Sequence, residues 1–133
     1  MRHVLDKGKP ARVGRADRPL DPKRGRAGKS GARRVIAQGR AEVFIVSLGA
    51  QGALLATAEG LHRFAAVPID GLSSVGAGDS MVAGIVLGLL RGLTLDEAVK
   101  FGMAAGAATL LRVGTELCRR EDAERFYGEL SAT

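Results

Sequence analysis

The segment Gly76-Ala77-Gly78-Asp79 places two glycines and a carboxylate directly before a long apolar run. Glycine lets the backbone approach a ligand closely. The first amides of a helix have no partner within the helix and lie at the positive end of its dipole, so a helix that begins here would hold an anion such as phosphate. A carboxylate beside that anion would act as a base toward a hydroxyl, which suits phosphoryl transfer. The alternative is that Asp79 only satisfies the helix start.

A second group of small residues, Ser47-Leu48-Gly49-Ala50-Gln51-Gly52, follows the β-branched apolar run at residues 42–47. In open α/β sheets, ligands bind beyond the carboxyl ends of the strands. The alternative is a plain turn in which glycine supplies a positive φ. Combined with Gly76–Asp79, the group predicts a nucleotide site with a base.

The elements that must position these residues are indicated by periodicity and by turn residues. Thr94 and Glu97 have the spacing of a capping box, so Thr94 is the predicted start of a helix. The order of the elements indicates the C-terminal part of an α/β domain. The predicted elements are a helix end at 33–39 with Gly39 as its stop, strands at 42–47, 53–57 and 61–67, a loop at 68–74, and helices at about 77–90, 95–111 and 119–130.

Burial is predicted for three of these elements. The strand at 42–47 is nearly all apolar, which suits burial on both faces. The helix at 77–90 is expected to be buried, with Gly84 and Gly88 permitting close packing by a neighbour. The helix at 119–130 has one apolar face, formed by Ala123, Phe126, Tyr127 and Leu130.

The net charge of +6 is unevenly distributed along the chain. Residues 1–40 contain 13 Lys/Arg and 3 Asp, a net of +10, while residues 41–133 contain 7 Lys/Arg and 11 Asp/Glu, a net of −4. Residues 1–32 are rich in Gly, Pro and Arg and poor in apolar residues, so they are predicted to be a disordered basic arm. The less favoured alternative for this arm is contact with the phosphates of a nucleic acid, which would be nonspecific because the arm has no aromatic residue for base stacking.

Several classes of protein are excluded by the composition. The 133 residues contain one cysteine, Cys118, which argues against an internal disulfide and for a reducing, cytoplasmic compartment. The two histidines, His3 and His62, are far apart in the sequence and have no neighbouring cysteine, so no zinc cluster is expected. No apolar run reaches the length of a membrane span.

Four strings of the sequence resemble the ribokinase-like (PfkB) carbohydrate kinase family. The string from Ser73 to Gly84 is similar to the second signature of that family, and the string from Val46 to Leu54 is similar to its ATP-contacting turn. The strings Phe101 to Leu110 and Gly114 to Cys118 are most similar to its bacterial minor 6-phosphofructokinase branch. The resemblance implies the C-terminal portion of a three-layer α/β/α sandwich, incomplete in this chain, in residues 33–133.

The resemblance also implies roles for individual residues. Asp79 would be the catalytic base, and the amides of Gly76, Ala77 and Gly78 would form an anion hole for the γ-phosphoryl group of ATP. The nucleotide would be bound by Ser47, Gly49, Gly52, Gly71, Met103 and Ala107. Mg²⁺ would arrive with ATP, and a potassium-like cation would have ligands at Ser73, Val75, Thr109, Arg112, Gly114 and Glu116, with the Arg112 side chain pointing away.

The chain also departs from the family pattern. A complete member is considerably longer, and its upstream half brings most sugar contacts, a lid and most of the central sheet. The family's Asn-x-x-Glu motif is not found before Ser47, and residues 1–32 do not resemble the family. We therefore hypothesise a foreign or misread upstream segment joined to a C-terminal kinase part.

Three functions follow as hypotheses. The first is ATP-dependent phosphorylation of a sugar phosphate, with fructose 6-phosphate as the expected acceptor and homo-oligomerisation expected of the full-length family member. The second is a non-catalytic, nucleotide-binding remnant of such a kinase, which is favoured for the isolated polypeptide. The third is nucleic-acid binding through the basic arm.

Overall fold

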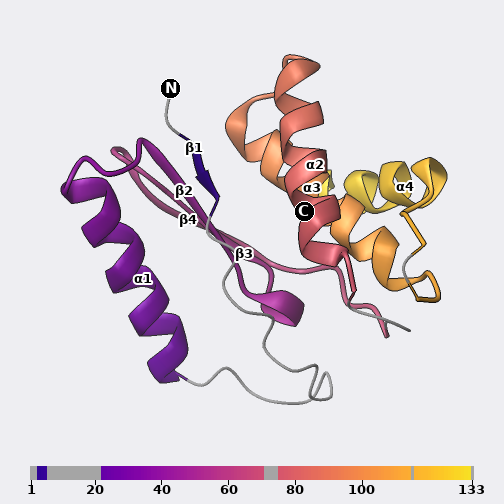
Figure 1. The fold of residues 1–133 in the computed structure, drawn as a ribbon, viewed down its shortest axis with the longest axis horizontal. Helices are drawn as coiled ribbons and strands as arrows, with labels where there is room; N and C mark the ends of the chain where they lie inside the picture. The colour runs from indigo at the N-terminus through magenta and orange to yellow at the C-terminus, as the bar shows by residue number, and fades with distance from the viewer. Residues whose placement is uncertain (1–2, 6–21, 71–74, 115, 133) are drawn as a thin grey trace. The chain divides into compact units, whose positions relative to one another are not determined.

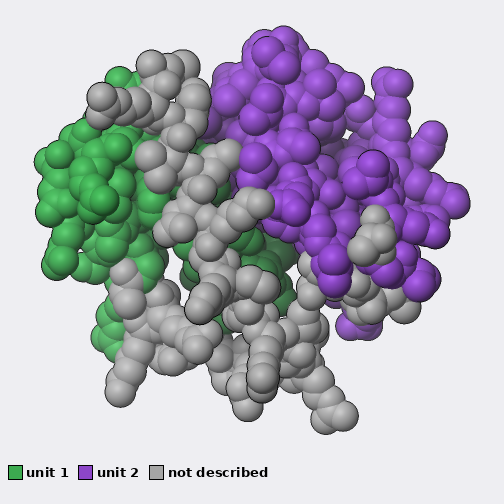
Figure 2. Space-filling model, viewed as in Figure 1, with its two compact units in different colours: residues 1–66 green, residues 67–133 purple. Residues whose placement is uncertain are grey.

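The computed structural model describes residues 3–5, 22–70, 75–114 and 116–132. The chain divides into two compact units, residues 1–66 and residues 67–133, which are coloured separately in Figure 2. Within the described residues, the N-terminal unit contains a sheet and helix α1, and the C-terminal unit contains helices α2, α3 and α4 (Figure 1). Across the parts of the chain that the structure describes, no helix combines the length and apolarity of a membrane span.

The N-terminal unit is built on a 4-stranded sheet in the order β1-β2-β3-β4. Strand β2 pairs in parallel with β1 and antiparallel with β3, and β3 pairs antiparallel with β4. The bounds are β1 His3–Leu5, β2 Val43–Ser47, β3 Ala53–Thr57 and β4 Gly60–Phe64. The predictions of β2 and β3 are confirmed, while β4 ends before the predicted residue 67.

Helix α1, Pro22–Ala37, covers one face of this sheet (Figure 1). Ala32 of the helix is buried against Leu54 and Ala56 of β3, and Ile36 packs against the same cluster. Leu54 and Ala56 are two positions apart in β3, so both point toward α1, as the two-residue period of a strand requires. The helix ends as predicted at Gly39, whose φ of 64° is in the left-handed region and whose amide donates to the carbonyl of Ile36 at 2.9 Å.

Two expectations for the N-terminal unit are corrected by the structure. Residues 22–32, predicted as part of a disordered arm, are helical, and residues 3–5 form a strand. The helix forms despite its glycines because Ala32 and Ile36 pack on the sheet, and tertiary packing outweighs weak local propensity. Strand β2 was expected to be buried on both faces, yet Ile45 is its buried residue while Phe44 and Val46 are half-buried.

The C-terminal unit is organised by close packing of α2, Ala77–Leu90, against α3, Leu95–Leu110. Glycines permit this approach: a Cβ on Gly84 would lie 2.8 Å from the Cα of Gly102, and one on Gly88 would lie 3.0 Å from the Cα of Ala98. The prediction that Gly84 and Gly88 allow close approach of a neighbouring helix is thus confirmed, with α3 as that neighbour.

Helix α4, Arg120–Ser131, packs its apolar side on α3. Ala123, Phe126 and Leu130 are buried, and the ring of Tyr127 meets that of Phe101 edge-on at 5.4 Å between centroids. The predicted apolar face of this helix is confirmed. Helix α2, by contrast, was predicted to be a buried helix, but Val86 is 48% and Leu90 80% exposed.

The capping box predicted at the start of α3 is present. The amide of Glu97 donates to Thr94 Oγ1 at 3.3 Å, and the amide of Thr94 donates to Glu97 Oε2 at 2.9 Å. The second bond, from the backbone of Thr94, lowers the pKa of the Glu97 carboxyl below its ordinary value of 4.5, with help from the Thr94 hydroxyl.

We expect Thr94→Ala to destabilise the C-terminal unit by about 1 kcal/mol, because one helix-start amide loses its acceptor. Because the folded-state pKa of Glu97 is lowered, its contribution is present above pH 4.5 and is lost as the pH falls through that lowered pKa. Denaturation of the native chain and of Thr94→Ala at pH 7 measures the first effect. Denaturation of the native chain and of Glu97→Gln at successively lower pH measures the second. Glu129→Gln, at an exposed position of α4, is the control, and it should lose stability at low pH to the same extent as the native chain.

Candidate active site

The start of α2 has the geometry of an anion-binding helix end. Gly76 is its N-cap residue and has a φ of 80°, a left-handed conformation that glycine adopts without strain. The carbonyl of Gly76 accepts the amide of Ser80 at 2.9 Å, which closes the first turn. Because glycine has no side chain, the N-cap residue offers no acceptor to the amides of Ala77 and Gly78, unlike Thr94 at the start of α3. These amides can therefore bind an anion.

Asp79 lies in this first turn and is exposed. The position of Gly78, directly before it, faces open space, since a Cβ there would meet no described atom within 4 Å. A carboxylate next to accessible amides can receive a proton from a hydroxyl that approaches the bound anion. The structure thus brings together Gly76, Ala77, Gly78 and Asp79 as the sequence predicts.

The C-terminal end of α3 lies beside the start of α2. Thr109 is 3% exposed, and its Oγ1 lies 2.7 Å from Ser80 Oγ and 3.0 Å from the carbonyl oxygen of Ala105. Since a carbonyl only accepts and the Thr109 hydroxyl has one proton, that hydroxyl can donate to Ala105 while accepting from Ser80. The hydrogen bond fixes Ser80, the residue after Asp79, against α3. The sequence analysis gave Ser80 no role and predicted Thr109 only as a cation ligand.

The segment after α3 contains three of the six residues predicted to hold a cation. The guanidinium of Arg112 donates to Glu116 Oε2 at 2.8 Å and 3.1 Å, so the charge of this arginine is compensated by a carboxylate four residues later. Gly114 has a φ of 67°, which turns the backbone between them. Val75 precedes the start of α2, and Ser73 lies outside the described residues, as does Gly71 of the predicted nucleotide set.

The glycine turn after β2 belongs to the N-terminal unit. Ser47 ends the strand, a short 3-10 helix spans Gly49–Gln51, and the carbonyl of Gly52 accepts the amide of Leu48 at 2.8 Å. A Cβ on Gly52, whose φ is 93°, would overlap the carbonyl oxygen of Phe64, so a side chain does not fit there. The turn lies tightly against the end of β4.

The other two predicted nucleotide residues, Met103 and Ala107, lie one helical turn apart on α3, where Met103 is buried and Ala107 half-buried. The predicted set is thus divided: Ser47, Gly49 and Gly52 lie close together in the N-terminal unit, and the base, the anion-binding amides, Met103 and Ala107 lie in the C-terminal unit.

Comparison with known proteins identifies the family. The family described as pfkB family carbohydrate kinase matches residues 27–122. The chain belongs to this family. It is 56% identical over 101 residues to the ATP-dependent 6-phosphofructokinase isozyme 2 of Mycobacterium tuberculosis, covering 76% of this chain and 30% of that protein. It is 41% identical over 103 residues to the isozyme of the same name in Escherichia coli, covering 77% and 33%.

The fold also matches solved kinases of this family. The structure of phosphofructokinase-2 from Escherichia coli in complex with potassium superposes with a TM-score of 0.74 at 40% identity, covering 83% of this chain and 35% of that one. The prediction of an incomplete, ribokinase-like mixed α/β fold is confirmed. This pfkB-family chain spans about a third of the length of the relatives it matches.

The end of α3 and the segment after it offer oxygen atoms to the cation that the sequence predicts. In the described residues, no group of three or more His, Cys, Asp or Glu side chains is placed to hold a metal ion. The end of α3 does present carbonyl oxygens at the negative end of a helix dipole, and the Arg112–Glu116 pair removes the charge that would oppose a cation. Hard cations are bound by such oxygens.

Proposed function

We propose that this chain carries the phosphoryl-transfer part of an ATP-dependent sugar-phosphate kinase, and that the whole protein phosphorylates fructose 6-phosphate. The observation that supports this most directly is the glycine-capped start of α2 with Asp79 in its first turn. The 56% identity to an ATP-dependent 6-phosphofructokinase supports the donor and the acceptor. ATP as donor accords with a cytoplasmic location, and homo-oligomerisation of the whole protein stays a prediction.

In this proposal Asp79 accepts the proton of the sugar hydroxyl as that oxygen attacks the γ-phosphorus of ATP, whose bond to the bridging oxygen breaks and releases ADP. The amides of Gly76, Ala77 and Gly78 hold the charge on the transferring group, which is the electrostatic contribution that usually dominates such reactions. The Ser80–Thr109 hydrogen bond keeps the first turn of α2 fixed against α3, so the amides and the carboxylate are held in place before substrate arrives.

The nucleotide would be bound by Ser47, Gly49 and Gly52 at the turn after β2, with Gly71, Met103 and Ala107 around the adenine and ribose. Gly49 supports this role, because a Cβ there would meet no described atom within 4 Å, which leaves its backbone open to a ligand. ATP would supply the phosphoryl group, with Mg²⁺ bridging its phosphates. A potassium-like cation would be held by oxygens of Ser73, Val75, Thr109, Arg112, Gly114 and Glu116.

A second candidate, nucleotide binding without turnover, is favoured by the length comparison. The chain aligns with 30% of its Mycobacterium tuberculosis relative, and the sugar contacts expected of the family's upstream half are not among the residues assigned above. Both candidates require ATP to bind, and they differ in whether ADP is formed.

The first experiment is a thermal melt of the 133-residue chain with and without MgATP and KCl. We expect ATP well above its Kd to raise the melting temperature by roughly 5 °C or more, since a ligand that binds the folded state stabilises it. AMP, which lacks the phosphates that the α2 amides would hold, should give a smaller shift. ADP formation with fructose 6-phosphate then separates the kinase from the remnant. A melt indifferent to ATP would contradict both.

A further inference from the structure

Helix α1 contains basic residues and no acidic one. The basic residues of Pro22–Ala37 are Lys23, Arg24, Arg26, Lys29, Arg33 and Arg34. The first turn of a helix favours carboxylates because the dipole is positive there, and α1 has none in that turn. The first turn therefore does not complement the dipole, whereas Arg34 in the last turn does.

The packing of α1 directs these charges outward. Ala32 is 1% exposed, and Ile36 packs beside it on Leu54 and Ala56, so the apolar side of the helix is held on the sheet. Four basic residues of α1 are exposed, and we call them the basic face: Arg26, Lys29, Arg33 and Arg34.

The charge of the basic face is poorly balanced within its own unit. Residues 1–66 contain fourteen Lys/Arg and five acidic residues, a net of +9. Glu59 lies at the β3–β4 turn, where a hydrogen bond from the Thr57 side chain lowers its pKa.

We propose that the basic face of α1 binds the phosphate backbone of a nucleic-acid duplex without sequence preference. Among the side chains that the structure describes between residues 26 and 37, the other exposed positions are Ser30, Gly31 and Ala37. These side chains include no large apolar one for membrane insertion and no aromatic one for stacking on single-stranded bases. The sequence placed these charges in a predicted disordered arm, where nucleic-acid binding was the less favoured alternative. The helix changes this, because it presents the charges on one fixed surface.

The spacing of the charges matches a line of phosphates. Arg26, Lys29 and Arg33 are three and four residues apart, which aligns them along one side of a helix. At 1.5 Å per residue this line is about 10 Å long, a length over which a duplex carries roughly six phosphate charges. Arg34 widens the line. Binding of this kind is nonspecific, with a Kd in the micromolar range or weaker.

The test is a fluorescence-anisotropy titration of a DNA duplex of about 20 base pairs with the full chain between roughly 50 and 200 mM KCl. Saturating MgATP is present to occupy the nucleotide site. For the native chain we expect log K to fall with log[salt] with a slope of about −3 or steeper. In Arg33→Gln/Arg34→Gln the slope should become less steep by about two, with a Kd at least about tenfold weaker at low salt. Glutamine keeps a similar helix propensity.

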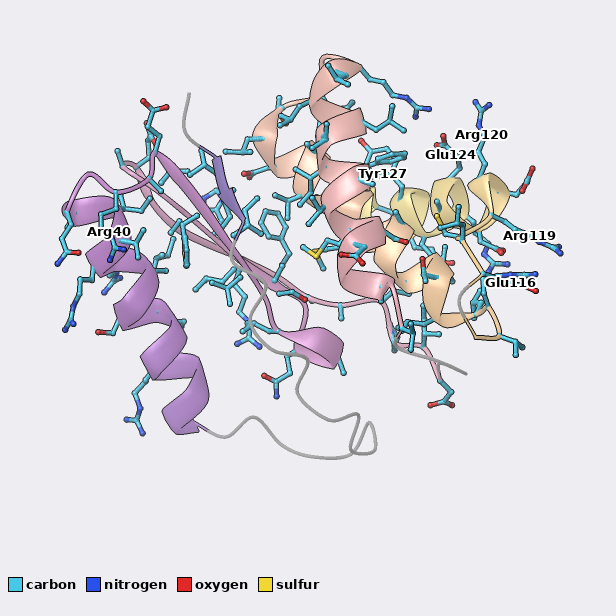
Figure 3. All side chains as sticks on the ribbon, in the orientation of Figure 1. Arg40, Glu116, Arg119, Arg120, Glu124 and Tyr127 are labelled. Atoms are coloured by element: carbon cyan, nitrogen blue, oxygen red, sulfur yellow. The ribbon has the colours of Figure 1, made fainter. Side chains whose placement is uncertain are left out.

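The matched control is Arg119→Gln/Arg120→Gln. This pair of adjacent, exposed arginines lies at the start of α4 (Figure 3), and its exchange changes the net charge equally. We expect its slope to equal that of the native chain. The proposal would be overturned if the two double variants lost duplex affinity equally or if neither changed the salt slope. It would also be overturned if the chain bound phosphatidylserine vesicles but not the duplex. If Arg33→Gln/Arg34→Gln loses the circular-dichroism signal of folded structure, the single variant Lys29→Gln replaces it as the test. For Lys29→Gln we expect the salt slope to become less steep by about one.

Discussion

Asp79→Asn is expected to lower the rate of ADP formation with fructose 6-phosphate by about a thousandfold, because a positioned general base contributes roughly 10²–10⁴ in rate. Asparagine has nearly the shape of aspartate, so the first turn of α2 and its amides should remain as they are. ATP should bind about two- to fivefold more tightly, since a negative charge beside its phosphates is removed. Steady-state rates and calorimetric titration with MgATP measure the two quantities separately.

Asp122→Asn is the matched control for this substitution. Asp122 is the third residue of α4, as Asp79 is the third of α2, and both lie in the first turn of their helix. Its exchange removes the same charge from a helix start that is not predicted to bind phosphate, so rate and ATP affinity should be unchanged. In a chain that binds ATP without turnover, the change in affinity is the deciding measurement. Weaker ATP binding in Asp79→Asn would contradict the placement of this carboxylate beside the phosphates.

The parts of the fold that the sequence predicted are set by neighbouring residues. The capping box of Thr94 and Glu97 satisfies amides within three residues, and Gly39 ends α1 through its own left-handed φ. Strands β2 and β3 are adjacent and antiparallel, so the short turn between them limits their register. Such signals are visible without knowledge of the tertiary structure.

The start of α1 could not be predicted in this way. Its glycines and arginines are typical of a disordered segment, and the residues that hold it on the sheet, Ala32 and Ile36, are weak signals individually. Their partners Leu54 and Ala56 are more than fifteen residues away in the sequence. Similarly, the exposure of Val86 and Leu90 depends on which side of α2 the neighbouring helix covers, and apolarity on all sides of a helix does not reveal that.

In the candidate site, too, some features could be predicted from the sequence and others could not. The segment Gly76–Asp79 was predicted as a helix start from residue types alone, and α2 begins there. The hydrogen bond between Ser80 and Thr109 joins residues 29 positions apart and was missed. Its one sequence signal is a hydroxyl residue within the apolar stretch that ends α3. The Arg112–Glu116 pair lies beyond the end of α3, so the helical spacing rule does not predict it.

Gly102→Ala is expected to destabilise the C-terminal unit by about 3 kcal/mol or more, because it adds a methyl group where α2 and α3 meet most closely. The new Cβ would lie 2.5 Å from the carbonyl oxygen of Met81 and would overlap the side chain of Ile85. The carbonyl belongs to the backbone of α2 and cannot rotate away, so the two helices must separate. Chemical denaturation followed by tyrosine fluorescence measures this, since Tyr127 is the one tyrosine, the chain has no tryptophan, and the ring contacts Phe101 of α3.

Gly128→Ala makes the same substitution in α4 with the opposite expected sign. A Cβ on Gly128 would meet no described atom within 4 Å, so the change acts through helix propensity and should stabilise the unit by roughly 0.5–1 kcal/mol. The contrast isolates interhelical contact from the general effect of alanine in a helix. If Gly102→Ala unfolded at the same denaturant concentration as the native chain, α2 and α3 could not be packed through these glycines. The helix start at Gly76 would then lose its support from Thr109, and Asp79 and the amides would not be held together.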